Sequence, residues 1–213
     1  MRRKVINLTG ITVVFLLLVY LVRVLNRIAF LISDGMEQTV LYIMIQWIIP
    51  VIVFLLMKRE EISFRDIGFS RDSLLLQALI GCLLGMLLAF FIYVIPDLIT
   101  GKPIFRSEID FHISDALYYI GGVAASEEIL FRGYLFQKIR KIKDSILLSA
   151  VVSSALFGIF HIYGGNVYQI LSASFFGMAF CLFRQKIKGC TLLSLIFAHG
   201  VYGTLGVQIF TLI

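Results

Sequence analysis

The sequence predicts an all-α, polytopic membrane bundle of about seven transmembrane helices. The chain has 213 residues, of which 60% are hydrophobic and 15% charged, and a water-soluble core of this length does not require so much apolar side chain. Several apolar runs approach the roughly 20 residues that a helix needs to cross a bilayer. Charged residues, glycine or proline interrupt the chain between these runs. We therefore expect a single integral-membrane domain over residues 1–213.

Seven apolar stretches are the expected spans. The first has a basic start and no clear small-residue cleavage site, which favours a retained helix over a signal peptide. Between the second and third spans, KREEISFRDIGFSRD (58–72) is polar with interspersed aromatic residues, so we expect an interfacial loop or a short amphipathic helix there. The expected spans are residues 5–25, 38–57, 73–98, 114–136, 145–163, 167–184 and 190–212.

Basic residues gather in alternate loops, and the positive-inside rule uses this bias to orient a membrane protein. One side carries Arg2, Arg3, Lys4, Lys58, Arg59, Arg65, Arg71, Lys138, Arg140, Lys141, Lys143, Arg184, Lys186 and Lys188, whereas the loop between the third and fourth spans carries Lys102 and Arg106. We expect a cytoplasmic N-terminus and an external C-terminus. The net charge of +6 is then a topology signal, so a lipid bilayer is an expected partner and nucleic acid is not. The short loops favour a multi-pass protein of a bacterial plasma membrane.

Small residues recur within the spans at positions that favour close helix packing in lipid. The three cysteines form no CxxC pair, so we expect small packing residues rather than disulfides or a zinc knuckle. The small residues are Gly81, Gly85, Ala173, Gly177, Gly200, Gly203 and Gly206, and the cysteines are Cys82, Cys181 and Cys190.

Three charged residues lie within the apolar stretch AASEEILFRGYLF (124–136), where each charge costs about 2.5–3.5 kcal/mol near the bilayer centre. On a helix, Glu128 and Arg132 share a face in the order that favours an ion pair. Glu127 is rotated by about 100° from Glu128 and remains available. A salt-bridged packing motif would account for the pair but not for Glu127.

Two histidines also lie in or near apolar spans: His161 in LFGIFHIYGG and His199 in LSLIFAHGVYG. Either one alone could be a packing or interhelical hydrogen-bond residue. Together with Glu127 they suggest a buried polar chamber. His112, in EIDFHISD, is expected on the surface. In the drawn spans His161 lies near an outer end while Glu127 and His199 lie near mid-membrane, so these residues meet only if the boundaries shift by about a turn or more.

This set of side chains suits hydrolysis. Removal from water favours the protonated form of a carboxylate, which suits it to proton transfer near neutral pH. An imidazole beside it helps to hold a water molecule, and a second imidazole can stabilise the oxyanion that forms when water attacks a carbonyl. The sequence contains neither a GxSxG elbow nor an HExxH motif, so the serine-hydrolase and zincin signatures do not apply.

EEILFR fits the motif EExxxR, FGIFH fits FxxxH, and HGVYG occupies the place of HxxxN. In order and spacing these motifs resemble the CPBP (Abi) family of CAAX-protease and bacteriocin-processing membrane proteins, over about residues 60–205. The resemblance implies an intramembrane endopeptidase that hydrolyses a peptide or a membrane-protein tail. It further implies that Glu127 and His161 activate the hydrolytic water and that His199 stabilises the oxyanion.

The resemblance also implies that Glu128 and Arg132 support the site, and it leaves one motif position unfilled. The asparagine of HxxxN is Gly203 here, which has no side-chain amide; Tyr202 and Asn166 are the expected substitutes for oxyanion or substrate contacts. Glu127, His161 and His199 could supply the three protein ligands of a catalytic zinc ion. The alternative is direct water activation by Glu127, and the resemblance favours no obligatory metal or other cofactor.

Two other functions stay open at this stage. A non-catalytic protein of the same fold could act in bacteriocin self-immunity or as a membrane scaffold, and Gly203 motivates this alternative. A proton-coupled transporter could also use intramembrane glutamate and histidine, although no inverted repeat is evident in the sequence.

Overall fold

The structure is a computed structural model that describes residues 8–101, 103–105, 109, 111–163 and 166–210. Within these residues the chain forms helices, and its one β-bridge joins Phe105 to Phe210. The first three helices are α1 (Leu8–Ile32), α2 (Gly35–Gln46) and α3 (Ile48–Glu60). A continuous helix then runs through α4 (Leu74–Ala89), the π-helical η1 (Phe90–Val94) and α5 (Ile95–Thr100).

A second long helix, residues 113–142, carries the motif of charged residues. It consists of α6 (Ile113–Leu117), the π-helical η2 (Tyr118–Ala124), α7 (Ala125–Glu128), the π-helical η3 (Ile129–Leu135) and α8 (Phe136–Ile142). The chain continues through α9 (Ile146–Phe160), the short 3₁₀ turn η4 (His161–Tyr163), α10 (Val167–Lys186) and α11 (Leu192–Gln208).

These helices confirm the predicted helical membrane bundle. Five helical stretches of the described chain are long and apolar enough to cross a bilayer, and α11 is a shorter apolar helix; the five are Val13–Ile32, Gly35–Glu60, Leu74–Thr100, Ile146–Tyr163 and Val167–Lys186. Large apolar side chains face outward on several of them: Leu17 is 63% exposed, Leu83 63%, Leu147 70% and Phe175 71%. Exposed apolar surface of this extent is typical of contact with lipid.

The expected boundaries need one substantial correction, at the first turn. Helix α1 continues to Ile32 and α2 begins at Gly35, so Arg27 lies inside a helix rather than in the loop that the spans 5–25 and 38–57 leave between them. Residues 5–7, 211 and 212 of the expected spans lie outside the described residues.

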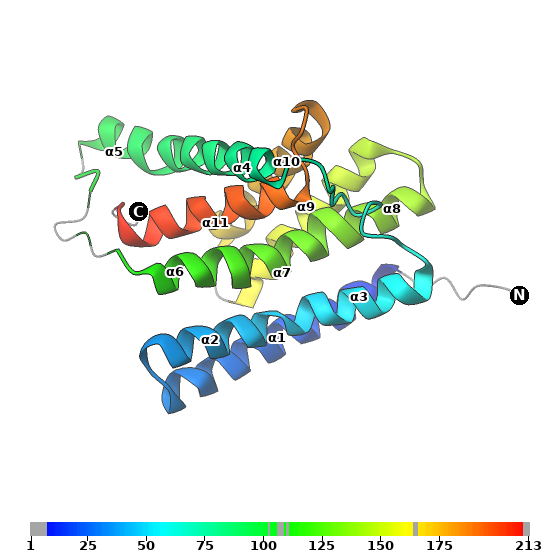
Figure 1. The fold of residues 1–213 in the computed structure, drawn as a ribbon, viewed down its shortest axis with the longest axis horizontal. Helices are drawn as coiled ribbons and strands as arrows, with labels where there is room; N and C mark the ends of the chain where they lie inside the picture. The colour runs from blue at the N-terminus through cyan, green and yellow to red at the C-terminus, as the bar shows by residue number, and fades with distance from the viewer. Residues whose placement is uncertain (1–7, 102, 106–108, 110, 164–165, 211–213) are drawn as a thin grey trace, which may run out of the picture.

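Figure 1 shows how the helices are arranged around the 113–142 helix. Helix α11 packs between α4 and η2, and α2 packs on the other side of η2 together with α1. Helices α9 and α10 pack against each other, and α9 also contacts η3 and α8. The start of α1 and the end of α11 lie at opposite ends of the bundle (Figure 1), as an odd number of crossings requires.

The junction of α2 and α3 is interrupted at Trp47 for a local chemical reason. Pro50 has no backbone N–H to donate to the carbonyl of Gln46, four residues earlier, and proline interrupts helices in this way. The indole Nε1–H of Trp47 donates to the carbonyl oxygen of Gly121 at 2.7 Å. This bond fixes the interrupted helix against η2.

The 58–72 stretch is a helix end followed by a loop: residues 61–73 contain turns and no helix. The loop enters the bundle, because Ile67 is fully buried and the Gly68 carbonyl accepts a hydrogen bond from the Leu192 backbone N–H at 2.9 Å. Of the two expected forms, the loop is the one observed.

Close approach of α4 and α11 confirms the predicted role of two glycines. A Cβ atom on Gly81 would lie 2.4 Å from the carbonyl oxygen of Ser194, and one on Gly85 would lie 2.6 Å from that of Ala198. Any larger side chain would therefore push the helices apart. The three cysteines are free, and Cys181 and Cys190 are buried.

The length of α9 sets the height of His161 along the bundle. Helix α9 is 15 residues long and ends directly before His161, which places this residue about 22 Å from the 142–146 turn. On the neighbouring helix, η3 and α8 contain seven residues each and place Glu128 roughly 20 Å from the same turn. Measured along the two helices, His161 therefore lies at about the same height as Glu128, as it must if these residues meet.

Candidate active site

The predicted ion pair within the 113–142 helix is present and buried. Arg132 Nη1 donates to Glu128 Oε1 at 3.1 Å, and the two side chains are 1% and 0% exposed. Two charges can stay out of water at tolerable cost only when each has a partner. The pair therefore accounts for Glu128 and Arg132, as the sequence predicts.

Aromatic rings and a glycine complete the surroundings of the Arg132 guanidinium. Its Cζ lies 3.9 Å from the centre of the Phe157 ring and 5.4 Å from that of Phe180, a cation–π arrangement. A Cβ atom on Gly177 would lie 3.0 Å from Arg132 Nη2, so the absence of a side chain at residue 177 leaves room for the close packing of α10 against the guanidinium. Helices α9 and α10 therefore both pack against the Arg132 side chain.

His199 lies between the two glutamates. Its Nδ1 is 2.9 Å from Glu128 Oε1, and its Nε2 is 3.8 Å from Glu127 Oε2. The first distance is that of a hydrogen bond; the second is too long for one. An ionised carboxylate can only accept, so Nδ1–H donates to Glu128, and Nε2 faces the Glu127 side of the site.

His161 reaches the site in a defined tautomer. Its Nδ1 lies 2.9 Å from the carbonyl oxygen of Phe157, which can only accept a hydrogen bond. Nδ1 therefore carries the proton, and in the neutral ring Nε2 keeps its lone pair. That lone pair is a hydrogen-bond acceptor for a water molecule.

Among the described residues, Glu127 has no partner comparable to that of Glu128. The residue is 8% exposed, and its contact with His199 is the 3.8 Å approach. The π-helical segments η2 and η3 lie on either side of α7, which contains both glutamates, and π-helical turns are frequent at functional sites. Glu127 is the charged side chain of this helix that packing does not explain.

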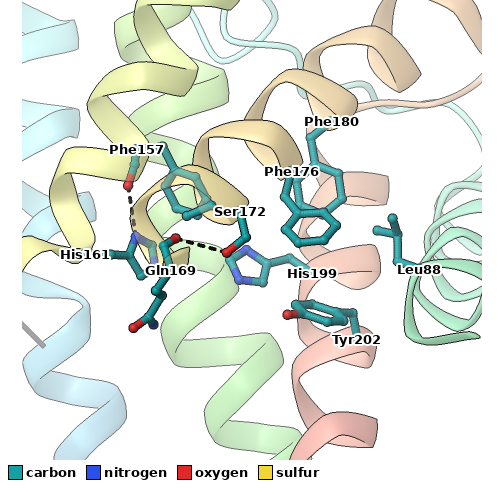
Figure 2. Close-up of a pocket in the computed structure, with 10 residues that line it drawn as sticks. Leu88, Phe157, His161, Gln169, Ser172, Phe176, Phe180, His199 and Tyr202 are labelled. Atoms are coloured by element: carbon teal, nitrogen blue, oxygen red, sulfur yellow. Dashed lines mark hydrogen bonds between the residues drawn. The ribbon is translucent and has the colours of Figure 1, made fainter. Parts of the chain in front are cut away.

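Two cavities meet at these residues. The first, which we call the aromatic cavity, has a volume of about 100 Å³ and is shown in Figure 2. In Figure 2, Gln169 lies between His161 and His199, and Tyr202 lies beside His199 on α11. The lining residues are Leu88, Phe157, His161, Gln169, Ser172, Ala173, Phe176, Phe180, His199 and Tyr202.

The second cavity, which we call the arginine cavity, is larger and has a volume of about 650 Å³. It lies between α1, α2 and η2, and Glu127 and His161 are part of its wall. The two cavities share His161 and Gln169. A substrate bound across them would therefore pass Glu127, His161 and His199 together. The other residues that line the arginine cavity are Val19, Val22, Arg23, Asn26, Arg27, Phe30, Tyr42, Gln46, Tyr118, Tyr119, Val123 and Phe160.

The candidate metal ligands do not form a metal-binding cluster. Among the residues that the structure describes, no three His, Cys, Asp or Glu side chains are placed to hold one ion. His199 directs Nδ1 to Glu128, and its free Nε2 is 3.8 Å from Glu127. That no metal is obligatory stays a prediction, and no step below depends on a metal ion.

The position of the missing motif asparagine is filled from a neighbouring helix. A Cβ atom on Gly203 would lie 2.8 Å from Cδ1 of Tyr119, so the tyrosine ring occupies the space where a side chain at 203 would begin. Tyr202, one expected substitute, lines the aromatic cavity with His199. Asn166, the other, is exposed and caps α10: its Oδ1 accepts from the Gln169 backbone N–H at 2.9 Å. It lines neither of the two cavities, and its contact with an oxyanion or a substrate stays a prediction.

Several site residues escaped the sequence analysis because their signal is spatial. Tyr119 lies on η2, and Gln169 lies on α10 between the two cavities. Arg23 and Arg27 could have been found from the sequence, because two arginines four residues apart are unusual in an apolar helix. His112 is exposed, as predicted.

We expect Glu128→Gln to destabilise the fold and Glu127→Gln to leave it stable. Loss of the Glu128 charge leaves Arg132 buried without its partner, a change that costs about 3–5 kcal/mol. Glu127 has no ion pair of this kind to lose. Thermal unfolding of both variants in detergent micelles measures the difference, and equal melting temperatures would contradict the assigned division of roles.

We expect Gly203→Asn to be destabilising because of Tyr119. Forcing a side chain against a packed ring costs about 1–3 kcal/mol, and Tyr119→Ala opens that space. The double variant should then be more stable than the sum of the single changes by roughly 0.5–3 kcal/mol, measured as a double-mutant cycle of unfolding. Gly121→Asn is the matched control, since nothing lies within 4 Å of a Cβ there. Additive effects would show that Tyr119 does not fill this position.

A family comparison now adds to the geometry. Residues 110–205 match the family model described as type II CAAX prenyl endopeptidase, Rce1-like. The chain matches no curated protein and no solved structure. The matched range contains all three motifs and covers slightly less than half of the chain; it begins at residue 110 rather than near residue 60. Over the segment that carries the candidate site, the predicted resemblance to the CPBP family is therefore confirmed.

Proposed function

We propose that this protein is an intramembrane endopeptidase of the CAAX-protease type that hydrolyses a peptide bond in a peptide or in the tail of a membrane protein. The observation that carries the proposal is the gathering of Glu127, His161 and His199 at two adjacent cavities that share His161 and Gln169. The family description of residues 110–205, an endopeptidase, points to the same class of reaction. The apolar helices support a multi-pass membrane protein, and we propose a bacterial plasma membrane as its location.

Activation of water is assigned to Glu127 and His161. Both line the arginine cavity, and His161 presents the Nε2 lone pair there because its Nδ1–H is held by the Phe157 carbonyl. A water molecule between them donates one hydrogen to the carboxylate and the other to Nε2. As the water oxygen attacks the substrate carbonyl carbon, Glu127 takes the proton, in the manner of a general base.

Stabilisation of the resulting oxyanion is assigned to His199. With Nδ1–H donating to Glu128, a proton on Nε2 is the one that the ring can donate to the oxyanion. Fixed donors aimed at a developing oxyanion are among the strongest contributions to catalysis. The Tyr202 hydroxyl is a second donor within the aromatic cavity. When the tetrahedral intermediate collapses, the C–N bond breaks and Glu127 returns its proton to the departing amine.

The support given by Glu128 and Arg132 is positional. Glu128 accepts from both Arg132 and His199 on the same oxygen, Oε1. Arg132 thus holds the carboxylate that orients the His199 ring. Neither residue needs to contact the substrate for this role.

We expect Glu127→Gln to abolish hydrolysis while leaving the fold intact. A glutamine cannot accept the proton from water, and general-base catalysis contributes about 10²–10⁴-fold in rate. The measurement is cleavage of a peptide library in proteoliposomes, read by mass spectrometry with ¹⁸O-labelled water, which marks the newly formed carboxyl group. Glu37→Gln, an exposed glutamate on α2, is the matched control. Full activity in the Glu127 variant would overturn the mechanism.

We expect hydrolysis to continue after treatment with a zinc chelator such as 1,10-phenanthroline. The reason is that the described side chains provide acceptors for water but no three-ligand metal cluster. Activity is measured before and after chelation and dialysis, with addition of zinc as the control. A loss that added zinc restores would assign the activation of water to a metal instead.

A non-catalytic role in bacteriocin self-immunity or as a membrane scaffold is the second candidate, and Gly203 favours it. Here the side chain of the motif asparagine is missing and Tyr119 occupies its space. Survival of immunity or partner binding after simultaneous replacement of Glu127 and His161 would favour this role over proteolysis.

A further inference from the structure

The arginine cavity carries charges that the proposed reaction does not use. Arg23 and Arg27 lie four residues apart on α1, and both line the cavity. They belong to the stretch Val13–Ile32, which is long and apolar enough to cross a membrane. Charged residues are rare in such helices and mark functional positions when they face a cavity.

The two guanidinium groups retain unused hydrogen-bond donors. Arg23 Nη1 donates to the Tyr163 carbonyl oxygen at 2.5 Å, which occupies one of the five N–H groups of an arginine. No hydrogen bond or ion pair between described residues involves Arg27. Glu127 is the acidic residue of the cavity wall, and it is assigned to the hydrolytic water. The cavity therefore offers positive charge that no acidic side chain among the described residues neutralises.

A neighbouring residue offers an acceptor in the same place. Asn26 lines the arginine cavity, and its Oδ1 is buried without a hydrogen-bond partner among the described residues. Buried polar atoms in native structures usually have partners. A backbone N–H of a bound peptide would satisfy this oxygen.

Arg23 and Arg27 both lie in the C-terminal half of α1. The helix ends at Ile32, so Arg23 lies about 13 Å and Arg27 about 7 Å from that end along the axis. By the predicted orientation this is the outer end of the helix. The arginines thus lie along the cavity whose other wall contains Glu127 and His161, and a peptide that reaches Glu127 through the cavity passes them.

We propose that Arg23 and Arg27 form an anion-binding subsite that holds a carboxylate of the peptide substrate while its scissile bond lies at Glu127. The inference rests on the proposed function. Guanidinium groups bind carboxylates through paired charge-assisted hydrogen bonds. The carboxylate comes either from an acidic side chain or from the end of the peptide chain.

Binding of short peptides to the Glu127→Gln protein tests the subsite without consuming the probe. The probes are a dansyl-labelled pentapeptide of valine and leucine with a free C-terminal carboxylate, its C-terminal amide, and an amide form with one aspartate. Fluorescence anisotropy in an uncharged maltoside detergent measures the affinities. We expect the amide without aspartate to bind roughly tenfold or more weakly than one of the carboxylate forms. Which carboxylate form binds better identifies the source.

Variants of the arginines then locate the effect. Arg27→Gln, made in the same Glu127→Gln protein, should remove the preference for a carboxylate, and Arg27→Lys should restore part of it. Arg71→Gln, an exposed arginine in the 61–73 loop, removes the same charge elsewhere and should change nothing. Two results would overturn the proposal. The first is equal binding of the acid and amide forms by the Glu127→Gln protein. The second is a preference for the carboxylate that persists after both Arg27→Gln and Arg23→Gln have been introduced.

Anionic lipid is the competing source of negative charge. The same measurement in nanodiscs of phosphatidylcholine, with and without phosphatidylglycerol, separates the two. An unchanged preference for the carboxylate supports the peptide subsite. If phosphatidylglycerol abolishes the preference and raises the melting temperature only when Arg27 is present, the occupant is a lipid headgroup and the proposal is wrong.

Failure of the proposed subsite can be distinguished from failure of the proposed function. If the unaltered protein does not hydrolyse peptides but binds a carboxylate in a manner that depends on Arg27, the proposed function is wrong and the anion-binding subsite stands. Hydrolysis that needs Glu127 but is indifferent to the carboxylate would remove the subsite alone.

Discussion

The burial of one guanidinium group organises this protein. Arg132 pairs through Nη1 with Glu128 on its own helix, lies over the Phe157 ring on α9 and packs closely against Gly177 on α10, while its Nε and Nη2 are buried without a hydrogen-bond partner among the described residues. The shared carboxylate oxygen then holds His199 on α11. Since an unpaired charge in this location would cost several kcal/mol, the four helical elements have little freedom to pack differently. The ion pair that stabilises the bundle also sets the geometry of the site.

Two adjacent glutamates consequently have different chemical situations. Glu128 is fully buried and committed to two partners, whereas Glu127 lies at the wall of a cavity with His199 at 3.8 Å. The pair resembles other sites in which neighbouring carboxylates are assigned different tasks by their surroundings. His161 completes this arrangement from the end of a short hairpin, where its ring is held by the last turn of α9.

The parts that could be predicted from the sequence are those that depend on local spacing. Apolar runs predicted the helices, and the four-residue spacing predicted the pairing of Glu128 with Arg132. The spatial partners could not be predicted in this way: Tyr119 fills the space beside Gly203 from another helix, and Gln169 lines both cavities from α10. A single sequence likewise does not show that His161 lies level with Glu128 along the bundle, or that Asn166 caps α10. The roles of the site residues and the orientation in the membrane remain predictions.

The charges on the 113–142 helix also bear on how the protein is made. This helix is not among the five stretches of the described chain that are long and apolar enough to cross a bilayer by themselves. The groups that surround Arg132 and orient Glu128 come from α9, α10 and α11, which leave the ribosome later. The helix therefore gains its full set of partners only when the C-terminal part of the chain has been synthesised. We therefore expect its stable integration into the lipid to be a late step of biogenesis, and a nascent chain that stops before α11 would lack His199.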